Sequence, residues 1–347
     1  MPHCILGTFP TPVEELVGLE RQFGCRGLYI KRDDLSGEPY GGNKVRKLEF
    51  ILADGLRQGA RGIVTSGAAG SNHALATAIY GRALGFEVEL LLFAQPASDE
   101  VRANLLAAFH AGARLHHADS YAAHCRMMED FLRGHEQTGE SLKCIPPGGS
   151  CALGALGYVN AALELKEQVE NGEMPEPDEI FVAYGTMGTA LGLALGIRLA
   201  GLRSRVRAVR VVPGVVANET TYKGLLDATK RLLTAADPAL ADSALGLGVL
   251  SVDDAWFGPG YGQTTREADE AIALFARREG IALDRTYTGK TAAAFLAAAR
   301  HNPPGRNVLF WLTKNSCPFP PESQRIDYRR LPPEFHHYFE AAHLERA

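Results

Sequence analysis

The sequence of 347 residues lacks the marks of a secreted or membrane protein. Its six cysteines are scattered and form no C-x-x-C pair, a pattern typical of reduced thiols in a cytoplasmic protein. No apolar run reaches the roughly 18 residues that a membrane span needs. The N-terminus shows no basic region followed by an apolar core, so no secretory signal is visible. We expect a cytoplasmic protein without membrane partners.

The sequence also has no excess of positive charge. The formal net charge is -4 and there is no long basic run. Nucleic-acid binding needs a concentrated positive surface, so nucleic acid is not expected as a partner. The histidines near 110–124 lack metal-ligand spacing, and we expect no metal site. A small molecule is the favoured partner.

Short aliphatic runs alternate with amphipathic helical patterns along almost the whole chain. This alternation predicts an α/β fold with mainly parallel sheets covered by helices. The expected strands are Leu28–Lys31, Gly62–Thr65, Val88–Phe93, Arg114–His117, Ile180–Ala183, Val206–Val212, Leu247–Val252 and Val308–Leu312. The expected helices include Lys44–Leu56, Ala74–Leu84, Leu153–Val169 and Thr265–Arg278.

A chain of this length exceeds the size at which one core usually stops growing, so two lobes are expected. The segment Pro146–Ser150 is a candidate boundary because its prolines and glycines interrupt the pattern. We predict a small domain over 48–152 and a large domain formed by 1–47 plus 153–347. The cleft between such lobes is where small molecules usually bind.

The turn Tyr184–Gly192 (YGTMGTALG) follows a buried strand and opens a helix. Its glycines and the helix N-terminus favour a phosphate site, to which Thr186 and Thr189 could donate hydroxyl hydrogen bonds. A tight turn that binds nothing is the alternative. A dinucleotide site is excluded, because the spacing is not GxGxxG and no acidic residue ends the next strand.

A second glycine-rich turn, Gly67–His73 (GAAGSNH), also joins a strand to a helix. Ser71 and Asn72 could form an anion pocket for a substrate carboxylate, or could simply cap the helix. No second glycine completes a nucleophile elbow, so no serine nucleophile is implied.

Lys44 follows Gly41, Gly42 and Asn43 and is expected in the first turn of a helix that Asn43 caps. Lysine is disfavoured at this end of a helix, and the helix dipole, together with Arg46 and Lys47, should lower the amine pKa. A lowered pKa is what a Schiff-base lysine requires, since only the neutral amine attacks a carbonyl. A solvated basic helix face is the alternative.

Three further segments carry weaker candidates. Asp33 and Asp34 could act as paired acid–base carboxylates, although adjacent carboxylates after a strand more often shape a turn. Tyr261 lies in the permissive loop GPGYG, and Tyr287 lies in YTGK just before an alanine-rich helix. Either tyrosine could present its hydroxyl to a site.

Taken in order, KRDDLSG, GGNKVRKLEF, SNH, PGGSCALGALGY, GTMGTALG, GPGYG and YTGK resemble one family of pyridoxal-phosphate enzymes. It contains D-cysteine desulfhydrase and 1-aminocyclopropane-1-carboxylate deaminase, and the likeness runs from Thr11 to Thr313. The resemblance implies a fold type II (tryptophan-synthase-β-like) architecture with two open twisted sheets, pyridoxal phosphate in the interlobe cleft, and a homodimer.

The resemblance also implies roles for individual residues. Lys44 would carry the cofactor and take the α-proton of the substrate. The phosphate would be held by Gly185, Thr186, Met187, Gly188 and Thr189. Asn72 would contact the ring hydroxyl and Thr313 would lie near the ring nitrogen. The substrate would contact Ser71, Asn72, His73, Tyr261, Tyr287 and Thr288, with Ser71, Tyr261 and Tyr287 also serving catalysis.

Two threonines bear on the reaction. Ring-opening deaminases of the family look like Tyr-Glu where this chain has Tyr287–Thr288, and like leucine where it has Thr313. Both threonines match the desulfhydrase pattern and favour β-elimination from D-cysteine, with release of pyruvate, ammonia and sulfide. Cysteate sulfo-lyase, the cyclopropane deaminase and a non-catalytic carrier of the cofactor are the alternatives.

The chain departs from the family pattern at three places. Gly70 stands where glutamine is usual, Met187 replaces a glycine, and Lys314–Asn315 replace a Gly-Gly pair. Lys314 adds a cation near the expected pocket, which keeps cysteate, with its anionic leaving group, among the possible substrates.

Overall fold

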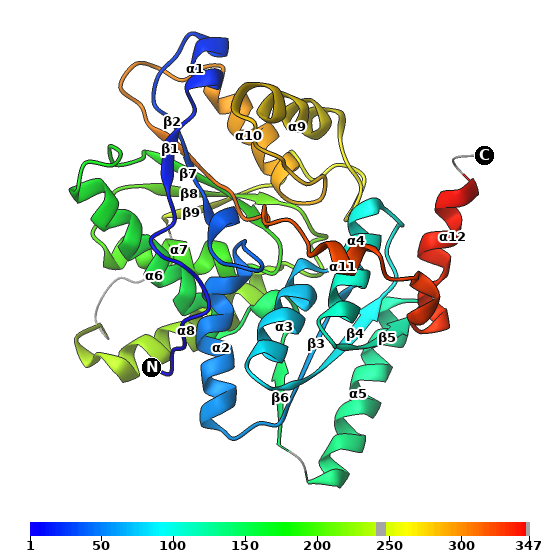
Figure 1. Ribbon diagram of the computed structural model, residues 1–347. Helices are drawn as coiled ribbons and strands as arrows, with labels where there is room; N and C mark the ends of the chain where they lie inside the picture. The colour runs from blue at the N-terminus through cyan, green and yellow to red at the C-terminus, as the bar shows by residue number, and fades with distance from the viewer. Residues whose placement is uncertain (140, 241–247, 345–347) are drawn as a thin grey trace. The chain divides into compact units, whose positions relative to one another are not determined.

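The computed structural model describes residues 1–139, 141–240 and 248–344. These residues form two compact units, each built around its own sheet (Figure 1). The first unit contains residues 7–47 and 150–317, and the second contains 2–6, 48–149 and the segment from 318 onward. The predicted α/β fold with two mainly parallel sheets is confirmed.

The first unit has a six-stranded sheet in the order β1-β2-β10-β7-β8-β9, in which only the β1–β2 pair is antiparallel. The strands are β1 Val13–Glu15, β2 Leu28–Lys31, β7 Glu179–Tyr184, β8 Arg205–Arg210, β9 Leu250–Asp253 and β10 Val308–Trp311. The helices are α1 Val17–Phe23, α6 Ala152–Glu170, α7 Gly188–Leu199, α8 Glu219–Ala236, α9 Arg266–Glu279 and α10 Thr288–Ala299.

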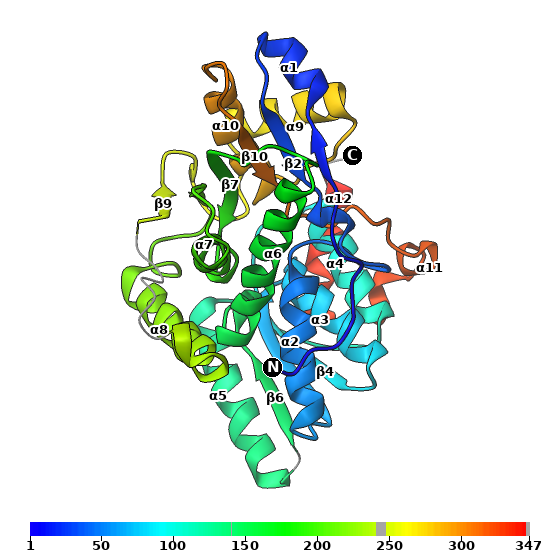
Figure 2. The same cartoon turned by 90° about the vertical axis from the view of Figure 1, so that its left-hand side faces the viewer.

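Two apolar clusters form the core of this unit. One contains side chains of α6 and α7, which lie side by side (Figure 2), and the other contains side chains of α1, α9 and α10. Helices on both faces bury the strands, and β10 is fully buried along its length. Burial on both faces explains why β10 is a continuous apolar run in the sequence.

The second unit has a four-stranded parallel sheet in the order β5-β4-β3-β6. The strands are β3 Gly62–Ala68, β4 Glu87–Phe93, β5 Arg114–Ala118 and β6 Leu142–Ile145. The helices are α3 Asn72–Ala83, α4 Asp99–His110, α5 Tyr121–Thr138, α11 Pro321–Gln324 and α12 His337–Leu344. Helix α2, Lys44–Arg57, begins in the first unit and continues in the second from Leu48. No helix in the described ranges is long and apolar enough to cross a membrane.

The segment that follows residue 317 groups with the second unit, whereas the sequence places it in the large domain. Its aromatic residues explain this grouping. The ring of His117, on β5, lies 5.1 Å from that of Phe335 and 6.0 Å from that of Tyr338. In addition, Arg102 of α4 donates a hydrogen bond to the Tyr338 carbonyl at 2.9 Å. These contacts join residues far apart in the chain, so local sequence patterns do not reveal them.

The predicted strands agree with the structure to within a few residues, although the start of Leu247–Val252 lies outside the described residues. Two strands were missed. β1 has three residues, two of them exposed glutamates, and β6 is a short strand that contains Lys143 and the exposed Cys144. Neither has an alternating or continuous apolar pattern, which is the signal on which strand prediction depends.

Candidate active site

The turn before Lys44 is fixed by close contacts with neighbouring backbone. Gly42 has φ +88°, and a Cβ there would lie 2.9 Å from the Thr313 carbonyl oxygen. A Cβ on Gly41 would lie 2.1 Å from the Asp34 carbonyl oxygen, so neither position has room for a side chain. The Asn43 amide donates to the Thr313 carbonyl at 3.1 Å. The glycine pair thus lets the start of α2 pack directly against the segment after β10.

Lys44 is a half-buried residue, and its amine makes no hydrogen bond or ion pair within the residues described. Burial lowers its pKa from 10.5 to about 8. The lowered pKa agrees with the expectation, but its cause differs from the predicted one. Arg46 does not act on Lys44, because its guanidinium is paired with Asp33 and Glu164. Desolvation therefore replaces the helix dipole as the explanation.

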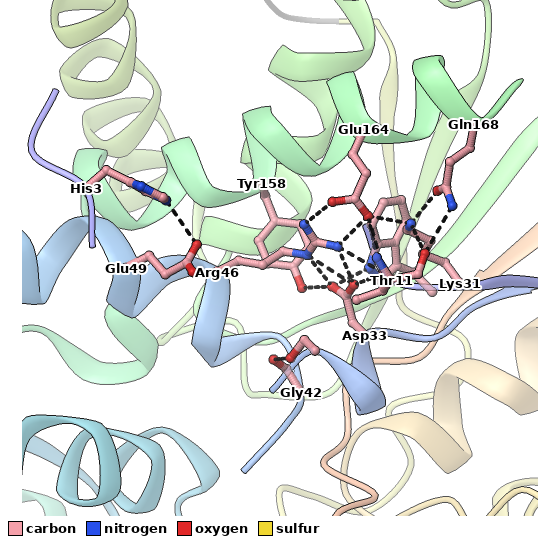
Figure 3. A network of polar contacts seen from close by, with 12 residues as sticks. His3, Thr11, Lys31, Asp33, Gly42, Arg46, Glu49, Tyr158, Glu164 and Gln168 are labelled. Carbon is pink, nitrogen blue, oxygen red and sulfur yellow. Dashed lines mark hydrogen bonds and ion pairs between the residues drawn. The ribbon is translucent and has the colours of Figure 1, made fainter. Parts of the chain in front are cut away.

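A buried polar network holds the first turn of α2 (Figure 3). The Arg46 guanidinium donates to Asp33 Oδ1 and to both oxygens of Glu164, each at 2.8 Å. Lys31 Nζ donates to Glu164 Oε1 at 2.5 Å and to the Thr11 carbonyl at 2.7 Å. Two cations thus face two carboxylates, and this balance makes their burial tolerable.

Asp33 is a structural carboxylate in this network. Burial alone would raise its pKa, but Arg46 and Lys31 hold the pKa below its usual range. Tyr158 and Trp311 also donate to it, at 2.6 and 2.7 Å. Asp34 is paired with Arg32 at 2.8 Å. The alternative that these adjacent carboxylates shape a local turn is correct, since both lie in the short 3₁₀ helix Asp33–Leu35.

The glycine-rich turn after β7 leads into α7 as predicted. Met187 precedes the helix with φ +70°, the one positive φ among the non-glycine residues of the described ranges. This backbone region costs an L-residue about 1–2 kcal/mol. Met187 is 4% exposed and packs in the apolar core, which offsets that cost and explains how methionine can replace glycine.

Two residues that the sequence analysis did not assign to the phosphate site, Ser150 and Lys47, lie beside this turn. Ser150 Oγ lies 2.8 Å from Thr186 Oγ1, accepts from the Gly188 amide at 3.2 Å, and accepts from Lys47 Nζ at 3.3 Å. Asn43 donates to Thr189 Oγ1 at 3.0 Å, so its amide contacts α7. These donors gather at the N-terminus of α7, where an anion is favoured.

The signal for Lys47 was present in the sequence. Lys44 and Lys47 are three residues apart in a helix, so their side chains lie on one face. Burial, followed by the charge of Lys44, lowers the pKa of Lys47 well below its usual value. A bound dianion would favour the charged form of both amines.

In the second unit, Ser71 caps α3. Its hydroxyl accepts from the Ala74 amide at 3.2 Å, as the capping alternative predicts. The Asn72 side chain accepts from Asn104 at 3.0 Å, and His73 Nε2 lies 3.0 Å from Thr65 Oγ1. Because the Thr65 hydroxyl donates to the Ile145 carbonyl, the His73 ring donates to Thr65. These contacts orient the three side chains within their own unit.

The departure at Gly70 also has a structural explanation. Its amide donates to Gln95 Oε1 at 3.0 Å, and a Cβ at this position would lie 3.2 Å from Gln95 Nε2 and 2.9 Å from Val101. The side chain of Gln95 therefore occupies the space beside residue 70. A glutamine at 70 would need that space.

The two candidate tyrosines contact each other. The hydroxyl groups of Tyr261 and Tyr287 lie 2.6 Å apart, and the rings meet edge to face with centroids 6.0 Å apart. A Cβ on Gly185 would lie 3.7 Å from the Tyr287 ring. The first unit thus brings this pair beside the turn that opens α7.

Thr288 is hydrogen-bonded to Asp284. Its hydroxyl donates to Asp284 Oδ2 at 2.5 Å and accepts from the Asp284 amide at 2.8 Å, and the residue is 1% exposed. The hydroxyl is engaged at the start of α10, and the contact of Thr288 with substrate stays a prediction. Thr313 is 8% exposed, and its hydroxyl makes no hydrogen bond with any of the described residues.

A family model described as pyridoxal-phosphate dependent enzyme matches residues 5–314. The chain belongs to this family. It is 35% identical to a putative 1-aminocyclopropane-1-carboxylate deaminase of Pyrococcus furiosus over 89% of this chain and 90% of the relative. It is 36% identical to a D-cysteine desulfhydrase of Klebsiella pneumoniae over 85% of this chain and 88% of the relative.

A solved structure described as the ACC deaminase homologue matches with a TM-score of 0.78 and 31% identity, over 90% of this chain and 92% of that chain. The fold type II architecture is confirmed by this neighbour. The protein is a pyridoxal-phosphate-dependent enzyme of the 1-aminocyclopropane-1-carboxylate deaminase and D-cysteine desulfhydrase type.

The residues of the first unit fit the cofactor. The space beside Gly188 is bounded by Ser150 Oγ and Lys47 Nζ, which would lie 2.8 and 3.0 Å from a Cβ at that position. These donors and the α7 N-terminus suit a phosphate group. On the same face of α2, Lys44 supplies an amine with a pKa of about 8. Covalent binding of pyridoxal phosphate requires donors for its phosphate and an amine that can react with its aldehyde.

The pKa of Lys44 predicts how fast the apoenzyme captures its cofactor at each pH. Only the neutral amine attacks the aldehyde, so the rate should rise about tenfold per pH unit below pH 7 and level off above about pH 8. The measurement is the rate of the absorbance change on mixing apoenzyme with cofactor between pH 6 and pH 10. A rate that still rises steeply at pH 10 would indicate an ordinary lysine.

Proposed function

We propose that this enzyme catalyses β-elimination from D-cysteine or a closely related β-substituted amino acid, releasing pyruvate, ammonia and the sulfur leaving group. The observation that carries the proposal is the Lys44 amine, which belongs to a half-buried side chain, is unpaired within the described residues and has its pKa lowered by burial to about 8. A neutral amine at this position can hold the cofactor and can accept a proton from the substrate.

We assign cofactor binding to residues of two kinds. Lys44 holds it covalently. The phosphate is held by Gly185, Thr186, Met187, Gly188, Thr189, Ser150 and Lys47. Asn72 contacts the ring hydroxyl and Thr313 the ring nitrogen, as the family resemblance implies. When bound, the cofactor withdraws electrons from the α-carbon of an amino acid, so that the α-proton can be removed.

The remaining steps depend on side chains. The α-proton moves to Lys44 Nζ, the bond between the β-carbon and sulfur breaks, and water then hydrolyses the released 2-aminoacrylate to pyruvate and ammonia. The Tyr261–Tyr287 pair, with its 2.6 Å contact, can donate a proton to the leaving sulfur. Ser71, assisted by Asn72 and His73, binds the substrate. We assign the substrate contacts to Ser71, Asn72, His73, Tyr261 and Tyr287, and the contact of Thr288 stays an expectation from the family resemblance.

The choice of β-elimination over ring opening rests on Thr313 and on the start of α10. A neutral hydroxyl at Thr313 supplies no carboxylate to keep the ring nitrogen protonated. The carboxylate at the start of α10, Asp284, accepts from the amides of Thr286, Tyr287 and Thr288 and from the Thr288 hydroxyl. It is therefore committed to the helix start. The cyclopropane amino acid has no α-proton that could be removed. Opening its ring therefore needs a further acid or nucleophile.

The substrate screen tests this choice. We expect D-cysteine or a close β-substituted analogue to be turned over with a kcat/KM at least about a hundredfold above that for the cyclopropane amino acid, equivalent to ~2.7 kcal/mol in transition-state stabilisation. The panel includes L-cysteine, cysteate, β-chloroalanine and D-serine, assayed for pyruvate or 2-oxobutanoate on one preparation. Efficient formation of 2-oxobutanoate from the cyclopropane substrate, with no reaction of the β-substituted compounds, would reverse the proposal.

Three further parts of the proposal remain expectations: the location and the division into domains rest on the sequence, and the homodimer rests on the family resemblance. The enzyme is expected to act in the cytoplasm, and the division into a cofactor-binding large domain and a small domain remains our interpretation of the two units. A homodimer is expected as well, and light scattering of the purified protein measures that mass directly.

A further inference from the structure

Lys290 is a buried cation that the proposed reaction does not use. It lies on α10 one helical turn after Tyr287 and is 0% exposed. Its Nζ donates to the carbonyl oxygens of Phe257 at 2.6 Å and Gly260 at 3.0 Å. The Nζ also lies 5.2 Å from the centroid of the Phe257 ring. A buried ammonium is costly unless such partners compensate its lost hydration.

The two carbonyls belong to the irregular segment between β9 and α9 that carries Tyr261. Within this segment Gly258 and Gly262 have φ of +69° and +74°, a backbone region that L-residues rarely adopt. A loop of this kind has few ladder hydrogen bonds to fix it in place. The ammonium of Lys290 binds the carbonyls of Phe257 and Gly260, and Gly260 directly precedes Tyr261.

The first turn of α10 therefore holds this loop at two points. Lys290 binds the carbonyls just before Tyr261, and the Tyr287 hydroxyl lies 2.6 Å from the Tyr261 hydroxyl. Tyr287 and Lys290 are three residues apart, so they project from neighbouring positions on one face of the helix.

We propose that Lys290 is a positioning residue that fixes the Tyr261 hydroxyl against Tyr287 by binding the Phe257 and Gly260 carbonyls. This inference rests on the proposed role of Tyr261 in the reaction, but the loop attachment itself can be tested without turnover. An apolar side chain of similar length would fill the same space without the cost of burying a charge. The positive charge of Lys290 is thus explained by the hydrogen bonds that it donates to the loop.

The first test measures backbone hydrogen exchange in the apoenzyme. We expect Lys290→Met to speed exchange in the peptide covering residues 256–263 at least about tenfold, because the loop loses two hydrogen bonds to a cation. Lys166→Met is the matched control, since Lys166 is partly exposed and, among the described residues, forms its ion pair with Glu170 on its own helix. Unchanged exchange in a folded Lys290→Met protein would overturn the proposal. Lys290→Gln, which loses the charge and the reach, replaces it if the methionine variant does not fold.

The second test is a double-mutant cycle in kcat/KM. We expect Lys290→Met to lower kcat/KM at least about tenfold in the native enzyme but less than about twofold in a Tyr261→Phe background, because both changes act on one hydroxyl. Lys290→Arg, which keeps a cationic donor, should recover part of the loss. Fully additive effects would show that Lys290 does not act through Tyr261. If Tyr261→Phe alone leaves turnover unchanged, the proposed role of Tyr261 fails, and hydrogen exchange still decides whether Lys290 holds the loop.

Discussion

Replacing Lys44 with alanine is expected to lower kcat by at least about a thousandfold and to abolish covalent attachment of the cofactor. The amine removed is the one that binds the cofactor and accepts the α-proton, and general acid–base groups typically contribute factors of 10² to 10⁴. Loss of the side chain should leave the fold intact, because Arg46 and its partners Asp33 and Glu164 hold the first turn of α2 independently of Lys44.

The control for this experiment is Lys166→Ala, which removes a partly exposed lysine that forms an i,i+4 pair with Glu170. We expect that variant to retain activity and covalent cofactor. Steady-state rates and the mass of the cofactor-loaded protein, measured side by side, separate the two cases. Covalent attachment that persists in a folded Lys44→Ala protein would place the cofactor on another amine, and Lys47 would be the first to examine.

Gly188→Asp is expected to weaken binding of pyridoxal phosphate at least tenfold, a loss of ~1.4 kcal/mol. The added Cβ would lie 2.8 Å from Ser150 Oγ and 3.0 Å from Lys47 Nζ, and the carboxylate would occupy the place of the phosphate. A carboxylate beside Lys47 at a helix N-terminus is itself favourable, so the variant should fold. We therefore expect the variant to weaken cofactor binding, because the carboxylate occupies the space of the phosphate and pairs with Lys47.

Gly188→Ala separates the two contributions, because it adds the same Cβ without a charge. We expect its affinity to lie between those of the native enzyme and the aspartate variant. Equilibrium titration of the apoenzymes with the cofactor gives the three dissociation constants. Equal affinity of the aspartate variant and the native protein would mean that the phosphate binds away from α7.

Sequence reasoning predicted two turns of the first unit that the structure contains, because glycine-rich turns have a local sequence signal. The glycine pair before Lys44 and the glycine-rich turn before α7 can each be recognised from a few consecutive residues, although the contact of Gly42 with Thr313 joins distant parts of the chain. Burial of Lys44, in contrast, depends on packing by segments distant in the chain. The sequence therefore predicted the direction of its pKa shift but attributed it to the wrong cause.

The features that were missed depend on hydrogen bonds that the sequence does not show. Ser150 was treated as part of a boundary, yet it bonds to Thr186 and Gly188, more than thirty residues away. The family resemblance assigned Thr288 to substrate, and the sequence did not reveal the local hydrogen bonds that join its hydroxyl to Asp284, four residues earlier. A residue's type and its neighbours in sequence do not reveal which partners have already used its donors and acceptors.

The most direct test of the central claim is to locate the cofactor on the chain. The holoenzyme is reduced with borohydride, which converts the imine to a stable secondary amine, then digested and examined by mass spectrometry. We predict that the reduced cofactor is recovered on the peptide that contains Lys44, on that residue alone, and that the visible absorbance disappears on reduction. Recovery on Lys47 or on any other lysine, or no covalent cofactor at all, would contradict the account.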